Sequence, residues 1–239
     1  MSPSKYLEGM LENCGILQAR SHVDEDLLTN LHEKAMEWFT LSTQYSEWIS
    51  SKHSTFLWLY GLPGAGKTVI AAWLQKQLSK PEQTLKEQDV VTIFCSREVN
   101  EINMILGLIS QLLSRIDRID FGQDETALPQ FLTKFKHEDE LLLDLWGLLE
   151  VLIKMYPRRE VIFIIDGIDE VKSKSRTQFL RSLQLLPERI NEGIIVRILV
   201  SSRDFPDIRD CLVSWPKIDK LTEWKGEENR VCIISRLTL

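Results

Sequence analysis

Hydrophobic residues along this chain occur in two patterns, short unbroken runs and longer stretches of helical spacing. The short runs have the length and the aliphatic and aromatic content of buried strands, and they span residues 55–60, 90–95, 161–166, 194–202 and, more weakly, 218–223. Apolar positions three or four apart predict amphipathic helices, which span residues 24–51, 68–78, 102–116, 138–155 and 175–190. Strands that alternate with helices predict an α/β fold. We expect a three-layer sandwich with a mostly parallel central sheet and helices on both faces.

Composition fits one folded domain. The 239 residues are 44% hydrophobic and 27% charged, and this length suits a single large α/β domain with short additions at its ends. We expect a helical lead-in over residues 1–51, the α/β domain over 52–225 and a short tail over 226–239.

Charge and hydropathy narrow the classes of partner. The net charge of −6 argues against a dedicated nucleic-acid-binding surface. No apolar run approaches the roughly 20 residues that a membrane span requires, and the first residues lack the apolar segment of a signal peptide. The cysteines and histidines are scattered, so they predict no metal site. We expect no nucleic-acid partner, no membrane span and a cytoplasmic location.

Residues 61–68 follow the first predicted strand and match the phosphate-loop spacing G-x-x-x-x-G-K-[ST]. Glycines at this spacing permit a tight turn in which backbone N–H groups converge on an anion. Lys67 would reach the β- and γ-phosphates, and the Thr68 hydroxyl would ligate Mg²⁺. The residues expected to bind the phosphates are Gly61, Gly64, Ala65, Gly66, Lys67 and Thr68. The loop therefore predicts binding of a nucleoside triphosphate with Mg²⁺.

A cluster of carboxylates follows a second strand. Asp166 ends the run at 161–166, where a carboxylate can share the magnesium ion with a phosphate loop. Gly167 allows a sharp turn, and Asp169 and Glu170 then add two carboxylates. Either Asp169 or Glu170 could orient or deprotonate an attacking water.

Arg203 comes directly after the strand at 194–202. A cation at the tip of a strand beside the other two could sense the γ-phosphate and stabilise charge in the transition state. Lys172, Lys174 and Arg176 also follow the acidic residues, and we interpret them as a solvated turn.

The segments that carry these groups read Phe-Leu-Trp-Leu-Tyr at 56–60 ahead of the loop at 61–68, Phe-Ile-Ile-Asp-Gly-Ile-Asp-Glu at 163–170, and Leu-Val-Ser-Ser-Arg at 199–203. Phe-Cys-Ser-Arg at 94–97 and the helix with Trp38 and Trp48 support them. Together they resemble the NACHT-type NTPases of the STAND class, most closely the fungal members that share the nephrocystin-3-like N-terminal module. The resemblance covers about residues 20–230.

This resemblance implies roles for particular residues. Asp166 would be the Mg²⁺ ligand, Asp169 or Glu170 the residue that activates water, and Arg203 the sensor. It also implies a sheet in which the sensor strand lies between the phosphate-loop strand and the strand that ends at Asp166. Members of this class act as switches that are closed with ADP and oligomeric with ATP, and slow hydrolysis resets them. The fungal members act in self/non-self recognition.

More than one function stays open at this point. Relatives continue into a lid and repeat domains, whereas this chain ends at Leu239 and its last residues, 229–239, diverge from the family pattern. The first hypothesis is a Mg²⁺-dependent NTPase that prefers ATP over GTP and hydrolyses it slowly. The alternative is a truncated binding module without useful turnover, which self-associates or modulates a full-length STAND relative. A small-molecule phosphotransferase is a third class, which the acidic cluster disfavours.

Overall fold

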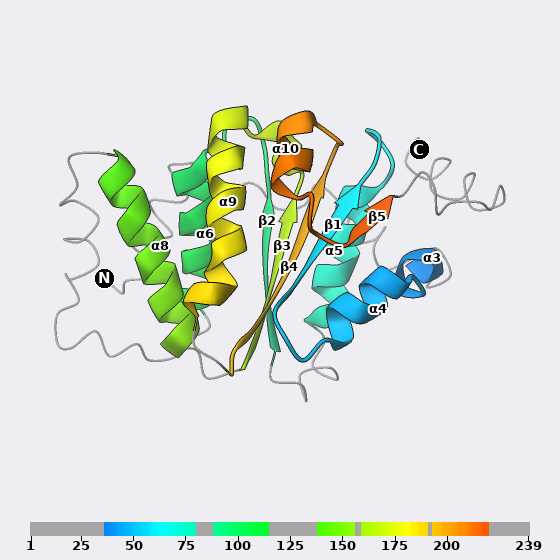
Figure 1. Cartoon of the computed structure of the whole chain (residues 1–239), viewed down its shortest axis with the longest axis horizontal. Helices are drawn as coiled ribbons and strands as arrows, with labels where there is room; N and C mark the ends of the chain where they lie inside the picture. Colours follow the sequence, from blue (N-terminus) through cyan, green and yellow to red (C-terminus); the bar gives the residue numbers. More distant parts are fainter. Residues whose placement is uncertain (1–35, 80–87, 115–137, 156–158, 191–192, 220–239) are drawn as a thin grey trace.

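The computed structural model describes residues 36–79, 88–114, 138–155, 159–190 and 193–219. Within these ranges the strands form one sheet in the order β2-β3-β4-β1-β5, and every neighbouring pair is parallel (Figure 1). The strands are β1 (Thr55–Tyr60), β2 (Gln88–Phe94), β3 (Glu160–Asp166), β4 (Ile195–Ser202) and β5 (Lys217–Asp219). The expected parallel sheet is confirmed, and β4, the strand that precedes Arg203, lies between β1 and β3.

Helices cover both faces of the sheet, as the sequence predicts (Figure 1). One face carries α6 (Glu101–Leu113), α8 (Glu138–Met155), α9 (Ser173–Arg189) and α10 (Pro206–Cys211). The other carries α3 (Glu37–Thr40), α4 (Thr43–Ser50) and α5 (Lys67–Leu78). A short 3₁₀ turn, η2 (Ile168–Glu170), follows β3. The arrangement is a three-layer α/β sandwich.

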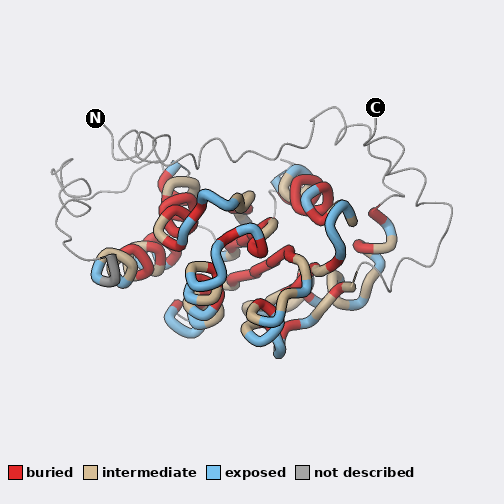
Figure 2. Tube along the Cα trace, turned by 90° about the horizontal axis from the view of Figure 1, so that it is seen from above, coloured by how far each residue is buried: buried red, intermediate tan, exposed pale blue. Residues whose placement is uncertain are grey.

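The central strands are apolar on both sides because helices bury both sides. In β3, Val161, Phe163 and Ile165 pack toward α6, α8 and α9, whereas Ile162 and Ile164 pack toward α5. All five of these side chains are fully buried. Figure 2 shows this buried layer running between the helices. An unbroken apolar run is therefore what a strand in this position requires.

The helix predicted over residues 24–51 is wrong in its described part, because two short helices replace it. The chain leaves α3 at Leu41 and turns at Ser42, whose backbone is extended (φ −65°, ψ 140°). The Ser42 hydroxyl accepts a hydrogen bond from the Tyr45 N–H and caps α4. Serine competes well for this capping role, so it starts a new helix instead of continuing the old one. Residues 24–35 lie outside the described ranges.

Most other boundaries agree with the predictions to within about two residues, the usual uncertainty of helix and strand ends. The weak strand predicted at 218–223 corresponds to β5, and residues 220–223 lie outside the described ranges. No helix in the described part of the chain is long and apolar enough to cross a membrane.

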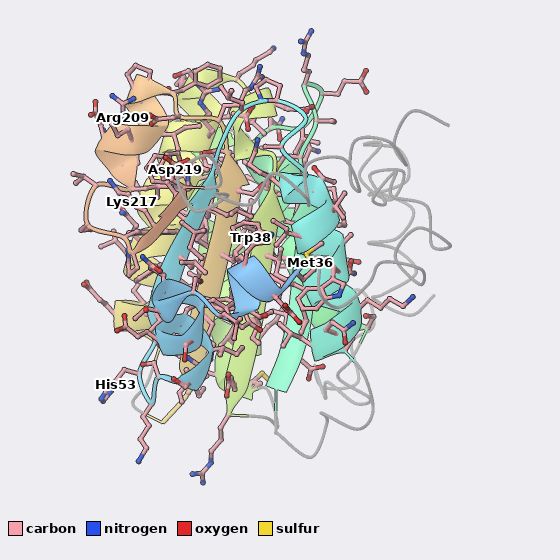
Figure 3. The ribbon with its side chains drawn as sticks, turned by 90° about the vertical axis from the view of Figure 1, so that its right-hand side faces the viewer. Met36, Trp38, His53, Arg209, Lys217 and Asp219 are labelled. Atoms are coloured by element: carbon pink, nitrogen blue, oxygen red, sulfur yellow. The ribbon has the colours of Figure 1, made fainter. Side chains whose placement is uncertain are left out.

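Arg197 ties α4 to the sheet. Arg197 belongs to β4 and is only 3% exposed. Its guanidinium donates to the carbonyls of Trp48 (2.6 Å) and Ser51 (2.5 Å) at the end of α4. It also pairs with the Glu160 carboxylate at 2.5 Å. A cation at a helix C-terminus satisfies carbonyls that have no partner within the helix. Figure 3 looks onto this side of the molecule, where α3 and α4 lie in front of the sheet. The exposed His53, in the connection between α4 and β1, lies at the opposite end of the sheet from Arg209 of α10.

We expect Arg197→Ala to lower the free energy of unfolding by about 3 kcal/mol, because it leaves buried carbonyls and the Glu160 carboxylate without their donor. Urea unfolding followed by circular dichroism measures this change. Arg189→Ala is the matched control, since Arg189 is exposed and pairs with Glu150 at 3.2 Å; it should cost less than about 1 kcal/mol. Equal losses in the two variants would contradict the anchoring role of Arg197.

Candidate functional site

The loop between β1 and α5 is built for close approach of an anion. Gly64 and Gly66 have φ angles of 72° and 79°, in the left-handed region where a side chain would be strained. The Ala65 N–H closes the turn on the Leu62 carbonyl at 3.2 Å. α5 starts at Lys67, so its free N–H groups and positive dipole end face the loop. The local geometry is that of a phosphate-binding turn.

Lys67 is buried at the base of this loop. Its ammonium donates to the carbonyls of Gly61 (2.8 Å) and Leu62 (3.0 Å). Burial lowers the pKa of Lys67, and the nearby carboxylates of Asp169 and Asp166 oppose that shift. The cation is therefore stabilised by groups on two different segments of the chain, the loop after β1 and the turn after β3.

Asp166 ends β3 and is held by residues on both sides. The Ser201 hydroxyl donates to its Oδ1 and accepts from the Gly167 N–H at 3.0 Å. The Thr68 side chain also hydrogen-bonds to the Asp166 carboxylate. Burial raises the pKa of Asp166, whereas the hydrogen bonds from Ser201 and Thr68 lower it. Ser201 is fully buried and thus fixes the orientation of this carboxylate.

The two carboxylates after Gly167 differ in environment. Asp169 is buried and bound by Arg203, whose backbone N–H donates to Oδ1 at 3.0 Å and whose Nε–H donates to Oδ2 at 2.5 Å. Glu170 is exposed. The Arg203 side chain is 38% exposed and packs over the ring of Phe205. Asp169 and Arg203 thus form a pair, and Glu170 remains at the surface of the site.

These groups line one pocket of about 430 Å³ at the carboxyl ends of β1, β3 and β4. The lining residues are Pro63, Gly64, Gly66, Lys67, Thr68, Arg97, Asp166, Gly167, Asp169, Glu170, Ser201 and Arg203. The structure therefore brings together all the predicted site residues except Gly61 and Ala65. Those two do not line the pocket: the Gly61 carbonyl accepts from Lys67, and the Ala65 N–H closes the turn.

Sequence reasoning missed two polar side chains of the pocket, Ser201 and Arg97. Ser201 precedes Arg203 by two residues, and its place at the end of β4 was the available signal. Arg97 follows β2, the neighbour of β3, so its strand also ends at this edge of the sheet. The segment at 94–97 supported the family resemblance, but nothing in it indicated a role for the Arg97 side chain at the site.

The interpretation of Arg176 as part of a solvated turn is wrong. Arg176 lies inside α9, is 9% exposed, and forms a bidentate pair with Asp207 at 2.8 Å through both Nε and Nη2. Lys172 and Lys174 are exposed, in agreement with the prediction, although Lys174 lies in the first turn of α9 and not in a loop. The charge pattern could not separate the three residues, because the partner of Arg176 lies on a distant segment.

The donor set of the pocket fits Mg²⁺. The Thr68 hydroxyl and the Asp166 carboxylate are hard oxygen ligands, which this ion prefers. In the described part of the chain, no three His, Cys, Asp or Glu side chains gather as a complete metal cage. An ion held by Thr68 and Asp166 would thus take its remaining ligands from phosphate oxygens and water, as Mg²⁺ does in sites that bind nucleotides.

The sequence matches the family model described as nephrocystin 3, N-terminal, over residues 34–203. The chain belongs to this family. The match spans the loop at 61–68, the acidic turn at 166–170 and the segment at 199–203, so it confirms the resemblance that those motifs carry.

The chain is also similar to a curated protein and to a solved structure. It is 24% identical over 188 residues to the vegetative incompatibility protein HET-E-1 of Podospora anserina, covering 73% of this chain and 13% of that protein. It also resembles the solved structure of the Aeropyrum pernix ORC1 protein in complex with DNA, with a TM-score of 0.50 and 14% identity over 82% of this chain and 46% of that one. An identity this low shows a shared fold alone, which here is the α/β phosphate-loop NTPase fold.

We expect Ser201→Ala to weaken Mg²⁺-dependent nucleotide binding about tenfold, since groups that orient a metal ligand typically contribute this much. Calorimetric titration of ADP with and without Mg²⁺ gives the ratio of the two dissociation constants. Ser202→Ala is the control, because the Ser202 hydroxyl accepts from the Trp58 indole N–H (2.8 Å) outside the pocket. A Mg²⁺ dependence unchanged by Ser201→Ala would show that Ser201 does not orient Asp166.

Proposed function

We propose that this domain binds a nucleoside triphosphate, preferably ATP, with Mg²⁺, and hydrolyses its β–γ bond slowly. The observation that carries this proposal is the single pocket in which Lys67, Asp166 and Glu170 meet. A phosphate-loop lysine, a carboxylate for the metal and a carboxylate for water are the parts that phosphoryl transfer to water requires. Magnesium would neutralise charge that develops on the β- and γ-phosphate oxygens.

Of the two carboxylates left open by the sequence, we assign water activation to Glu170. Both oxygens of Asp169 already accept hydrogen bonds from Arg203, and its side chain is only 5% exposed. Glu170 is exposed and lines the same pocket, so its oxygens can reach a water. Asp169 would instead hold Arg203, the group that senses the γ-phosphate.

The wider role we propose is that of the NTPase core in a STAND-type signalling switch of the self/non-self recognition kind. The name of HET-E-1, a vegetative incompatibility protein, supports this class. The chain spans only 13% of that relative, so oligomerisation, association with full-length STAND proteins and a cytoplasmic location are part of the proposal. The DNA in the ORC1 complex belongs to that protein, and the net charge of −6 favours no nucleic-acid partner here.

Binding without useful turnover is a second candidate, and the Asp169–Arg203 pair favours it. A guanidinium that already donates to a carboxylate at 2.5 Å is less available to a γ-phosphate. In that case the domain would bind nucleotide and modulate the assembly of itself or of a larger relative. Nucleotide affinity together with phosphate release separates the two candidates.

We expect Lys67→Ala to abolish measurable nucleotide binding and, with it, phosphate release, because the phosphates lose their buried cation. Calorimetric titration with ATP, ADP and GTP measures binding and base preference, and a phosphate-release assay measures turnover. Lys76→Ala on the same helix α5 is the control, since Lys76 does not line the pocket. Equal phosphate release by the native chain and Lys67→Ala would remove the NTPase assignment.

We expect Glu170→Gln to lower kcat by about 10²- to 10⁴-fold, the usual contribution of a general base, while the affinity for ATP stays near the native value. Glu188→Gln, an exposed change on α9, is the control. Tight binding with no turnover in the native chain would instead support the binding module. If Asp169→Asn abolished turnover with intact ATP binding and Glu170→Gln did not, the assignment of the two carboxylates would be reversed.

A further inference from the structure

Arg176 joins the two segments that carry Asp169 and Arg203. From α9, its Nη1 donates to the carbonyls of Asp169 (2.9 Å) and Val171 (3.0 Å), which form the turn after β3. Its Nε and Nη2 donate to the two carboxylate oxygens of Asp207, which lies at the start of α10, just after β4. One nearly buried guanidinium thus holds the acidic turn and the sensor segment at the same time.

Phe205 completes the connection to the sensor. The Cζ atom of Arg176 lies 5.2 Å from the centre of the Phe205 ring, and the Cζ atom of Arg203 lies 5.0 Å from it. Both guanidiniums therefore pack over one aromatic ring, a favourable arrangement for a cation. Arg203 in turn donates to the Asp169 carboxylate, while Arg176 holds the Asp169 carbonyl. The contacts form a closed circuit through Asp169, Arg203, Phe205 and Arg176.

The ion pair between Arg176 and Asp207 anchors this circuit to the start of α10. Hydrogen bonds from Arg176 lower the pKa of Asp207 to about 2, so Asp207 is ionised at any physiological pH. The Ser173 hydroxyl donates to the same carboxylate at 2.6 Å. A bidentate pair in a fork geometry fixes orientation as well as distance. Arg176 itself is absent from the pocket lining, so any effect on the site is indirect, through the turn at 169–171 or through the segment that carries Arg203.

We propose that Arg176 is a positioning residue of this site: by bridging the Asp169 turn to Asp207 and Phe205, it holds the Arg203 guanidinium at the pocket, where that guanidinium can distinguish a triphosphate from a diphosphate. The inference rests on the proposed nucleotide-binding function. It assigns to Arg176 a role in discrimination between nucleotides, separate from a contribution to the stability of the fold.

The test uses the full chain with Arg176→Gln and Asp207→Asn, which remove the two ends of the pair. Arg189→Gln is the matched control, because Arg189 lies on the same helix and its pair with Glu150 is distant from the pocket. Dissociation constants are measured with Mg²⁺ for ADP and for a non-hydrolysable ATP analogue. Arg203→Gln removes the proposed sensor completely and therefore gives the largest loss of triphosphate preference to be expected.

We expect Arg176→Gln and Asp207→Asn to leave ADP affinity near the native value and to reduce the preference for the triphosphate analogue about tenfold, less than the 10²- to 10³-fold typical of losing a direct donor. A purely structural role would weaken both nucleotides equally or change neither. An unchanged preference for the triphosphate analogue in both variants would overturn the proposal. If Arg176→Gln does not fold, the preference measured in Asp207→Asn alone decides.

A second readout needs no nucleotide. The Arg203 Nε–H, which donates to Asp169, should give a protected ¹H–¹⁵N signal, assigned by its loss in Arg203→Lys. In Arg176→Gln and Asp207→Asn this proton should exchange with water at least about tenfold faster, whereas Arg189→Gln should leave it unchanged. Unaltered exchange would overturn the proposal. Failure of the native chain to bind any nucleotide would refute the proposed function, and the exchange experiment would still decide whether Arg176 positions Arg203.

Discussion

The place of β4 between β1 and β3 is the constraint on which the site depends. Parallel strands end at one edge of the sheet, so the segments that follow these three strands meet there. Successive side chains of a strand point to opposite faces of the sheet. The last two residues of β4, Ser201 and Ser202, therefore direct their hydroxyls to different partners. Ser201 bonds to Asp166 of β3, whereas Ser202 accepts from Trp58 of β1. One strand end therefore supports both of its neighbours at the edge where the pocket forms.

The charges of the pocket are balanced in a way that suits a ligand with charges of both signs. Burial raises the pKa of Asp166 and lowers that of Lys67, so each ion would be costly alone. Each shift is opposed by the other residue, since Lys67 lowers the pKa of Asp166 and Asp166 raises that of Lys67. A metal-bound triphosphate brings an anion to the lysine and a cation to the carboxylate, so it preserves this balance where a free anion would not.

The parts of the fold and of the site that the sequence predicts correctly are those that residues close together in the chain determine. The phosphate loop, the apolar run that ends at Asp166 and the strand before Arg203 each lie within a few residues, and short-range sterics and burial fix their form. The break at Ser42 was missed because the apolar spacing continues across it and indicates one helix, although serine favours a helix cap over a helix interior. Arg176 was missed for another reason: its carboxylate partner, Asp207, is 31 residues away, and only the packing of α9 against α10 brings them together.

The contacts of the Asp169–Arg203 pair fall into two groups, those that involve the end of the Arg203 side chain and those that do not. The Arg203 backbone N–H and the Arg176 guanidinium hold Asp169 through its Oδ1 and its carbonyl, and neither contact involves the end of the Arg203 side chain. Only the Nε contact to Oδ2 competes with a phosphate for the same guanidinium. A turn of this side chain toward a γ-phosphate, as the proposed sensor role requires, would leave the acidic turn in place, because the contacts that shape the turn do not depend on the end of that side chain.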